Sequence, residues 1–277
     1  MRQYTEVIEH YTEYDEAGRL FRSRSCLERI RTQELLLRHL PPAPATVADV
    51  GGGPGVHAFW LAEQGYAVHL LDLTPKHVAQ ARAHAGTTGV SLADIREGDG
   101  RALPYADASF DVVLLFGPLY HLPEHEDRLR ALREAYRVLR PGGVLFAAIL
   151  SRFSPMMDDV MFHPTADPQK IDYFANAVLP EGRWINPPGV SLFTTAYFHL
   201  PQEARAEATE AGFDVEHLYA VESFARYLPN FDAVWEDPTA LENVLRLIRQ
   251  VEEHEALLGV SALKFSHLGG EEKNRFS

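Results

Sequence analysis

The residues best suited to chemistry form a short glycine-rich segment directly after an apolar run. Residues 46–50 read as a buried strand, and residues 57–64 have the composition of a helix. Between them, residues without a Cβ let the backbone turn sharply and let a ligand approach the main chain closely. The first amides of the helix would point at whatever this loop holds. The candidate binding residues here are Asp49, Gly51, Gly52, Gly53 and Gly55.

A carboxylate follows at a spacing that points to a nucleoside ligand. The apolar run at residues 67–72 predicts a second strand, and it ends in Asp72, about 20 residues after the glycines. A ribose-binding acid occupies this place in nucleotide-binding βαβ units. The glycines alone leave two cofactor classes open. Residues 53–58 satisfy the relaxed dinucleotide pattern G-x-G-x-x-G/A, whereas residues 51–55 read G-x-G-x-G after an acid.

Two later segments separate these alternatives. Residues 98–116 run Gly-Asp-Gly-Arg-Ala-Leu-Pro and then Phe-Asp with an apolar strand, and residues 137–143 run Arg-Val-Leu-Arg-Pro-Gly-Gly. With the G-x-G-x-G loop, these motifs resemble the signature blocks of class I S-adenosylmethionine (SAM) dependent methyltransferases. The likeness is greatest to the small-molecule methyltransferases of ubiquinone and menaquinone biosynthesis. A nicotinamide dehydrogenase has no reason to carry the second and third blocks.

The resemblance implies SAM as the cofactor and assigns roles to individual residues. It places Asp72 at the ribose and Asp99 at the exocyclic amine of adenine, with the residues after Asp99 beside the ring. The carboxylate of SAM needs a cationic or polar partner, for which the resemblance favours Tyr14 and Arg19. Surface exposure is the alternative for every arginine of that N-terminal segment. The other candidates for cofactor binding are Leu73, Gly100 and Phe116.

The same resemblance implies an α/β fold: a Rossmann-like, doubly wound, seven-stranded sheet with an inserted cap region. We expect five segments: an N-terminal helical segment (1–40), a SAM-binding Rossmann-like core (41–150), a cap or substrate-binding insertion (151–200), the C-terminal part of the core (201–268) and a tail (269–277).

Periodicity predicts the elements of the later core. Leu129, Leu132, Tyr136 and Leu139 form one helical stripe, and the Pro141-Gly-Gly turn should stop that helix before a strand at residues 144–150. Further along, we expect a helix at 201–211, a strand at 213–221, a helical stripe within 241–251 and a weakly patterned final strand within 259–267.

His121 is the leading candidate for a general base. It follows the strand predicted at residues 110–116, whose C-terminal end should face the cofactor, and histidine titrates near neutral pH. Tyr120 beside it would orient the substrate. Packing of the loop is the alternative role for both side chains. His125 lies four residues further on, but Pro123 should start the helix and leave His121 outside it, so we predict no metal site.

The cap region is rich in aromatic and methionine side chains without a clear period. Packing within the cap would explain more than half of them, and the remainder would wall an apolar substrate cavity above the methyl donor. The side chains concerned are Phe153, Met156, Met157, Met161, Phe162, Tyr173, Phe174, Trp184, Phe193, Tyr197 and Phe198.

Composition fits a cytoplasmic metabolic enzyme. The chain has 277 residues, a net charge of −13 and a single cysteine, so it carries no internal disulfide. The absence of a lysine- or arginine-dense run argues against nucleic-acid partners, and the apolar runs are too short for a membrane helix. We therefore expect a small-molecule acceptor as the only partner; the sequence says nothing about oligomeric state.

Three functions stay open at this point. The first is a SAM-dependent methyltransferase that acts on a small, partly apolar metabolite through an O, N or C nucleophile. The second is a nicotinamide-dependent oxidoreductase. The third is a non-catalytic protein that binds SAM as a ligand.

Overall fold

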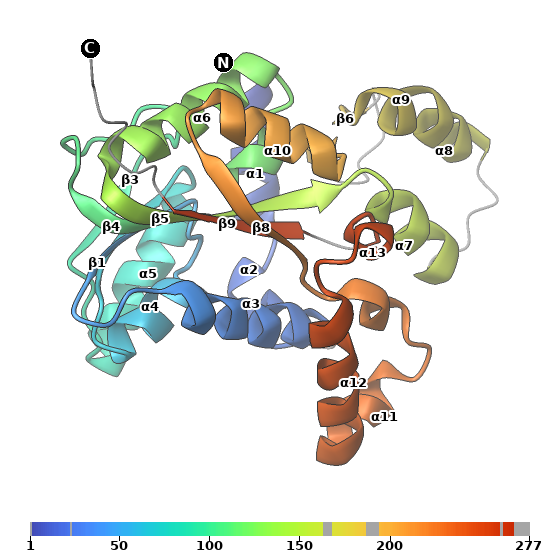
Figure 1. Cartoon of the computed structure of the whole chain (residues 1–277). Coiled ribbons are helices and arrows are strands. Elements are labelled where there is room, and N and C mark those ends of the chain that lie inside the picture. Colours follow the sequence, from blue (N-terminus) through green and yellow to red (C-terminus); the bar gives the residue numbers. More distant parts are fainter. Residues whose placement is uncertain (1, 23, 163–167, 187–193, 261–262, 269–277) are drawn as a thin grey trace, which may run out of the picture.

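A single mixed sheet runs through the centre of the molecule (Figure 1). The computed structural model describes residues 2–22, 24–162, 168–186, 194–260 and 263–268. Five parallel neighbours lie in the order β3-β2-β1-β4-β5, and β9 then runs antiparallel between β5 and β8. The strands are β1 (Thr46–Val50), β2 (Ala67–Asp72), β3 (Asp94–Glu97), β4 (Phe110–Leu115), β5 (Leu139–Ser151), β8 (Asp214–Ala220) and β9 (Leu263–Leu268). The predicted seven-stranded, Rossmann-like α/β fold is confirmed.

Helices cover both faces of this sheet. One face carries α3 (Ser25–His39), α4 (Val56–Glu63) and α5 (Pro75–Thr88), and the other carries α6 (His125–Val138) and α10 (Pro201–Glu210) (Figure 1). Helix α1 (Arg2–Glu13) is hydrogen-bonded to both sides, through Tyr4 to Asp127 of α6 and through the Thr12 carbonyl to Lys76 of α5. Strand β4 is apolar from Val112 to Leu115 because both of its faces are covered there. Val113 and Leu115 belong to the core on one face, while Val112 and Leu114 belong to the core on the other. Successive strand residues point to opposite faces, so a doubly covered strand needs apolar residues at every position.

Two details of the predicted core are wrong. Tyr136 is 43% exposed rather than part of the buried stripe of α6, because its ring lies at the rim of the helix against Phe213. The Pro141-Gly-Gly turn also does not precede the strand but lies within β5. There it forms a bulge, since Leu139 pairs with Phe110 and the pairing resumes only at Val144.

The cap contains more regular structure than its sequence pattern indicates. It comprises α7 (Ser154–Phe162), α8 (Pro168–Tyr173), a π-helical turn (Phe174–Val178), α9 (Leu179–Glu181) and a hairpin of β6 (Arg183–Trp184) and β7 (Ala196–His199). Phe174, Trp184 and Phe198 form a small core of their own, and β7 joins the C-terminal end of β5. Phe193 lies outside the described residues.

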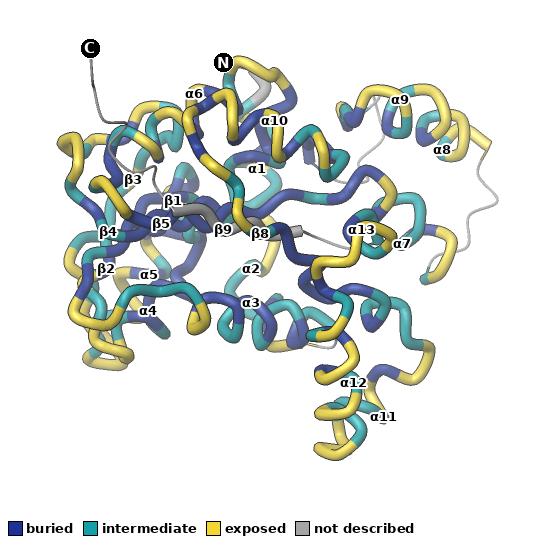
Figure 2. The backbone as a smooth tube through the Cα atoms, viewed as in Figure 1, coloured by how far each residue is buried: buried dark blue, intermediate teal, exposed yellow. Residues whose placement is uncertain are grey.

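A second group of helices connects β8 to β9. It contains a 3₁₀ turn (Ser223–Tyr227), α11 (Phe231–Glu236), α12 (Pro238–Val251) and α13 (Glu255–Leu258). Phe231, Leu245 and Ile248 pack with Leu27 of α3, so this group is attached to the core, while its outer surface is exposed (Figure 2). Within the described residues, no helix is both long enough and apolar enough to cross a membrane.

Candidate active site

The glycine loop lies between β1 and α4 and is packed too closely for other residues. Gly51 has a φ of 72°, and a Cβ on it would stand 2.6 Å from Pro118 Cδ. A Cβ on Gly52 would stand 2.5 Å from Asp49 Oδ2. Both positions therefore require glycine for space, and Gly51 also requires it for its left-handed backbone. The resulting loop exposes main-chain atoms to a cavity of about 140 Å³.

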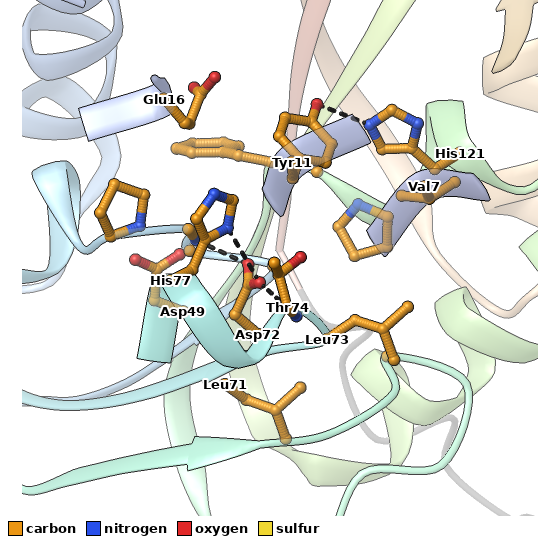
Figure 3. Close-up of a pocket in the computed structure, with 18 of the residues that line it drawn as sticks. Val7, Tyr11, Glu16, Asp49, Leu71, Asp72, Leu73, Thr74, His77 and His121 are labelled. Atoms are coloured by element: carbon orange, nitrogen blue, oxygen red, sulfur yellow. Dashed lines mark hydrogen bonds and ion pairs between the residues drawn. The ribbon is translucent and has the colours of Figure 1, made fainter. Parts of the chain in front are cut away.

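Asp72 ties the glycine loop to the end of β2. Its Oδ2 accepts a hydrogen bond of 2.8 Å from the Gly53 amide, and its Oδ1 accepts one of 2.8 Å from the Thr74 amide. His77 Nδ1 lies 3.1 Å from the same Oδ1 (Figure 3). Asp72 is buried but lines the cavity. A carboxylate has about four acceptor sites, so these contacts leave capacity for a ligand hydroxyl.

Asp49 is a buried acid beneath the same loop. Among the described residues, its Oδ2 has no hydrogen-bond partner. Burial, with a smaller contribution from the charge of Asp72, raises the pKa of Asp49 to about 7. A buried acceptor without a partner is costly, so this oxygen suits a ligand that offers a donor or a positive charge.

Asp99 and the other predicted contacts lie around the rest of this cavity. The Asp99 carboxylate receives hydrogen bonds from Arg101 and keeps 36% of its side chain exposed. Arg101 in turn lies over the ring of Tyr4, at 3.9 Å from its centroid. The cavity is also lined by Leu73, Gly100, Phe116 and Arg19.

Helix α1 covers the cavity. Tyr4, Val7 and Tyr11, spaced three and four apart on one helical face, all line it, as does Glu16 of α2 (Glu16–Arg19). That spacing is the signal by which Tyr11 could have been singled out from the sequence. Tyr14, which the resemblance favoured, lines the adjoining second cavity and is not among the residues around the first.

His121 and Tyr11 form a partly buried polar pair of the site. His121 lies in a 3₁₀ turn (Pro118–His121) after β4, and its Nδ1 is 3.2 Å from the Thr195 carbonyl oxygen. A carbonyl only accepts, so Nδ1 carries the proton. Burial lowers the pKa of His121 to about 4, and the ring is therefore neutral at pH 7. Its Nε2 must then accept the hydrogen bond of 2.9 Å from the Tyr11 hydroxyl (Figure 3).

A second, larger cavity of about 500 Å³ opens beside the first. Its walls come from the cap, the end of β5 and the loop after β8, including Phe174, Trp184 and Phe198. The two cavities share a wall made of Tyr11, Glu16, Arg19, Glu28, Phe116 and Tyr120. His121 lines the first cavity, whereas Tyr11 and Tyr120 line both.

His125 does not face His121. It is the first residue of α6, and its Nδ1 lies 3.2 Å from Glu207 while its Nε2 lies 3.3 Å from Glu210. Pro123 does not start α6, because the helix begins two residues later at His125 with Glu124 as its N-cap; His121 lies outside the helix as expected. Across the residues with described side chains, no group of three or more histidine, cysteine or acidic residues could hold a metal ion.

Comparison with known proteins agrees with this geometry. Residues 48–147 match the family described as "Methyltransferase domain". The chain is 33% identical over 122 residues to an arsenite methyltransferase of Halobacterium salinarum, covering 43% of this chain and 30% of that protein. It is 37% identical over 110 residues to the ubiquinone/menaquinone biosynthesis C-methyltransferase UbiE of Methylobacterium nodulans, covering 39% and 42%. The chain thus spans less than half the length of either relative.

A solved structure extends the likeness in fold beyond the matched residues. A SAM-dependent methyltransferase of Methanosarcina mazei superposes with a TM-score of 0.59 at 17% identity, covering 86% of this chain and 98% of that one. At this identity the likeness concerns the fold. Residues 48–147 therefore match a methyltransferase domain, and they include the glycine loop and Asp72, the acid at the end of β2.

Proposed function

We propose that this chain transfers a methyl group from SAM to a small, partly apolar acceptor. The observation that carries the proposal is the pair of adjoining cavities with a shared wall. The first lies on the glycine loop, where a nucleoside would bind, and the second is walled by aromatic side chains. An acceptor in the second cavity would meet the donor at Tyr11, Phe116 and Tyr120.

The residues of the first cavity fit SAM chemically. The orphaned Oδ2 of Asp49 suits a positively charged ligand, and SAM carries both an ammonium and a sulfonium. Asp72 has acceptor capacity for ribose hydroxyls, and the partly exposed Asp99 has capacity for the adenine amine. Arg19 lies at the shared wall, bonded to Glu16 and Glu28, where it can receive the amino-acid end of the donor.

The chain contributes mainly alignment and exclusion of water. When bound, SAM supplies a methyl group that is already activated by its sulfonium. Positioning of the reacting groups can be worth about 7–11 kcal/mol in favourable cases. Helix α1 contributes to the walls of both cavities and the cap to those of the second, so these elements would help to exclude water from the bound reactants.

For an acceptor that must lose a proton, we assign the base role to His121 acting through Tyr11. His121 does not line the second cavity, but Tyr11 lines both and donates to His121 Nε2. The acceptor proton would pass to the Tyr11 oxygen as the Tyr11 proton passes to Nε2. Tyr120, half-buried beside them, would orient the acceptor. The alternative is that the Tyr11–His121 hydrogen bond only fastens α1 over the cavity.

Calorimetry with SAM, S-adenosylhomocysteine and NAD tests the cofactor assignment. We expect the first two to bind and NAD not to bind; the reverse result would favour a nicotinamide-dependent oxidoreductase. A screen of metabolites with isotopically labelled SAM then tests turnover. SAM binding without transfer to any acceptor would favour a non-catalytic SAM-binding protein. The single buried cysteine, Cys26, is compatible with the expected cytoplasmic location.

A further inference from the structure

The second cavity carries more negative than positive side chains. The acids on its wall are Glu16, Glu28, Asp158, Asp159 and Glu222, and the cations are Arg19, Lys170 and Arg226. Each arginine is bracketed by two of the acids: Arg19 by Glu16 and Glu28, and Arg226 by Asp158 and Glu222. Five carboxylates thus face three cations within one cavity. Among the described residues of this wall, carboxylates therefore outnumber cationic side chains by two.

Arg226 is engaged by the chain itself. Its Nε and Nη2 donate to Asp158 at 2.8 and 2.6 Å, and its Nη1 donates to Glu222 at 2.9 Å. All three guanidinium nitrogens therefore face carboxylates of the chain. An acceptor with a carboxylate or phosphate would have to share this guanidinium with two carboxylates of the chain. The arrangement disfavours an anionic acceptor.

One carboxylate oxygen of Asp159 illustrates the excess of acidic side chains in the second cavity. It is buried in α7 with 4% exposure, and its Oδ1 pairs with Lys170. Among the described residues, its Oδ2 has no hydrogen-bond partner, although Asp159 lines the cavity. Glu222 is buried as well, at 1% exposure, and burial together with the nearby charge of Glu28 raises its pKa, against the opposing effect of Arg226. Buried carboxylates of this kind gain from a cation between them.

Resting on the proposed function, we propose that the acceptor carries a cationic group, such as a primary ammonium, held by Asp158, Asp159 and Glu222. The apolar body of the acceptor would lie against Phe174, Trp184 and Phe198. Asp158, Asp159 and Glu222 line only the second of the two cavities, whereas Tyr11, Phe116 and Tyr120 line both. The cationic group is therefore a recognition element at a distance from the atom that is methylated.

Three probes of one shape and different charge test this inference: tyramine, 4-ethylphenol and 3-(4-hydroxyphenyl)propionate. Their binding is measured by calorimetry on the full chain saturated with S-adenosylhomocysteine. We expect tyramine to bind about 10-fold tighter than 4-ethylphenol or better, because a charge-assisted hydrogen bond adds that much, and the propionate to bind weakest. Equal or tighter binding of the neutral or anionic probe, or no binding of tyramine, would overturn the proposal.

Variants locate the cationic group. Asp159→Asn and Glu222→Gln should each weaken tyramine about 10-fold and leave 4-ethylphenol unchanged. Asp107→Asn, in an ion pair whose carboxylate is 77% exposed and outside both cavities, is the matched control and should change neither. If Glu222→Gln fails to fold, Asp159→Asn alone decides. Equal weakening of all probes would contradict charge recognition.

The donor assignment can fail separately from the acceptor inference. Affinity for S-adenosylhomocysteine is measured alone in the same preparations. Loss of that affinity with a retained preference for tyramine would refute the proposed function and keep the cation-binding cavity. Normal affinity with no preference for tyramine would refute the acceptor class and keep the donor site.

Discussion

At the scale of single residues, Asp72 both holds the glycine loop and lines the first cavity, where we place the nucleoside of SAM. Asp72→Ala removes the acceptor of the Gly53 and Thr74 amides along with the proposed ribose contact. We expect SAM affinity to fall by about 1–3 kcal/mol, measured by calorimetry, because a charged acceptor is lost. Asp72→Asn should lose less, since it keeps one carbonyl acceptor. Unchanged affinity in a folded Asp72→Ala protein would place the ribose at another carboxylate.

His121 is the second residue with a defined test. If the acceptor nucleophile is a hydroxyl, His121→Asn should lower kcat by about 10²-fold while SAM affinity stays nearly constant. Tyr11→Phe should give a similar loss, because it interrupts the hydrogen bond that connects His121 to the second cavity. His125→Asn is the control, as His125 lies outside both cavities. Normal turnover in His121→Asn would leave the histidine with a packing role.

The protonation of His121 can be measured directly. NMR titration of the histidine rings should give His121 a midpoint near its pKa of about 4 and not near 6.5. The Tyr11 hydrogen bond would then persist throughout the neutral range, and any loss of activity caused by protonation of His121 would begin only near pH 4. A midpoint above 6 would mean that the ring is more solvated than the structure indicates.

At the scale of elements, α1 and α12 offer a matched comparison. Helix α1 contributes Tyr4, Val7 and Tyr11 to the wall of the first cavity. Helix α12 packs with α3, and no residue of α12 lines either of the two cavities. S-adenosylhomocysteine should therefore slow amide hydrogen exchange in α1 more than in α12, because a ligand stabilises the elements that hold it. Equal protection of both helices would indicate that α1 does not close over the donor.

At the scale of the whole molecule, two buried groups of the first cavity should have opposite effects on how the stability of the fold changes with pH. The pKa of His121 is lowered to about 4 by burial, so the ring stays neutral in the folded protein. The unfolded chain then binds a proton that the folded protein does not, and stability falls as pH drops from 6.5 to 4. The pKa of Asp49 is raised to about 7 by burial, so the folded protein binds this proton more tightly than the unfolded chain. Its contribution to stability therefore grows as pH drops from 7 to 3.8. Between pH 6.5 and 4.5 the opposite contributions of His121 and Asp49 to the free energy of unfolding largely cancel.

Below that window, stability should fall. Burial alone would raise the pKa of Glu34 and of Glu207, but polar partners outweigh it and hold both pKa values at about 2: arginines for Glu34, and His199 with Arg128 for Glu207. The stability that these two groups contribute is lost as pH decreases from 4.5 towards 2. Urea denaturation across this range checks both windows. Between pH 6.5 and 4.5, Asp49→Asn should introduce a loss of stability on acidification and His121→Asn a gain. Slopes of the same sign in the two variants would contradict the assignment.

Local patterns in the sequence predict the core of the fold and the residues at the edge of the first cavity. Strands β1, β2 and β4, the glycine loop and the position of Asp72 follow from local properties: side-chain alternation, absence of a Cβ and spacing along the chain. The family match covers these same residues, 48–147. The chemical roles of Asp72, Asp99, Arg19 and His121 remain predictions.

Contacts between side chains that are distant in the sequence could not be predicted from local patterns. The Tyr11–His121 hydrogen bond joins residues 110 positions apart, and the second cavity combines α2, α3, the cap and the loop after β8. The sequence pattern also did not predict the exposure of Tyr136 or the helices of the cap. Periodicity reports which face of an element is buried, but it does not report what that face is buried against. Docking of whole elements settles that, through packing contacts that no local stretch of sequence contains.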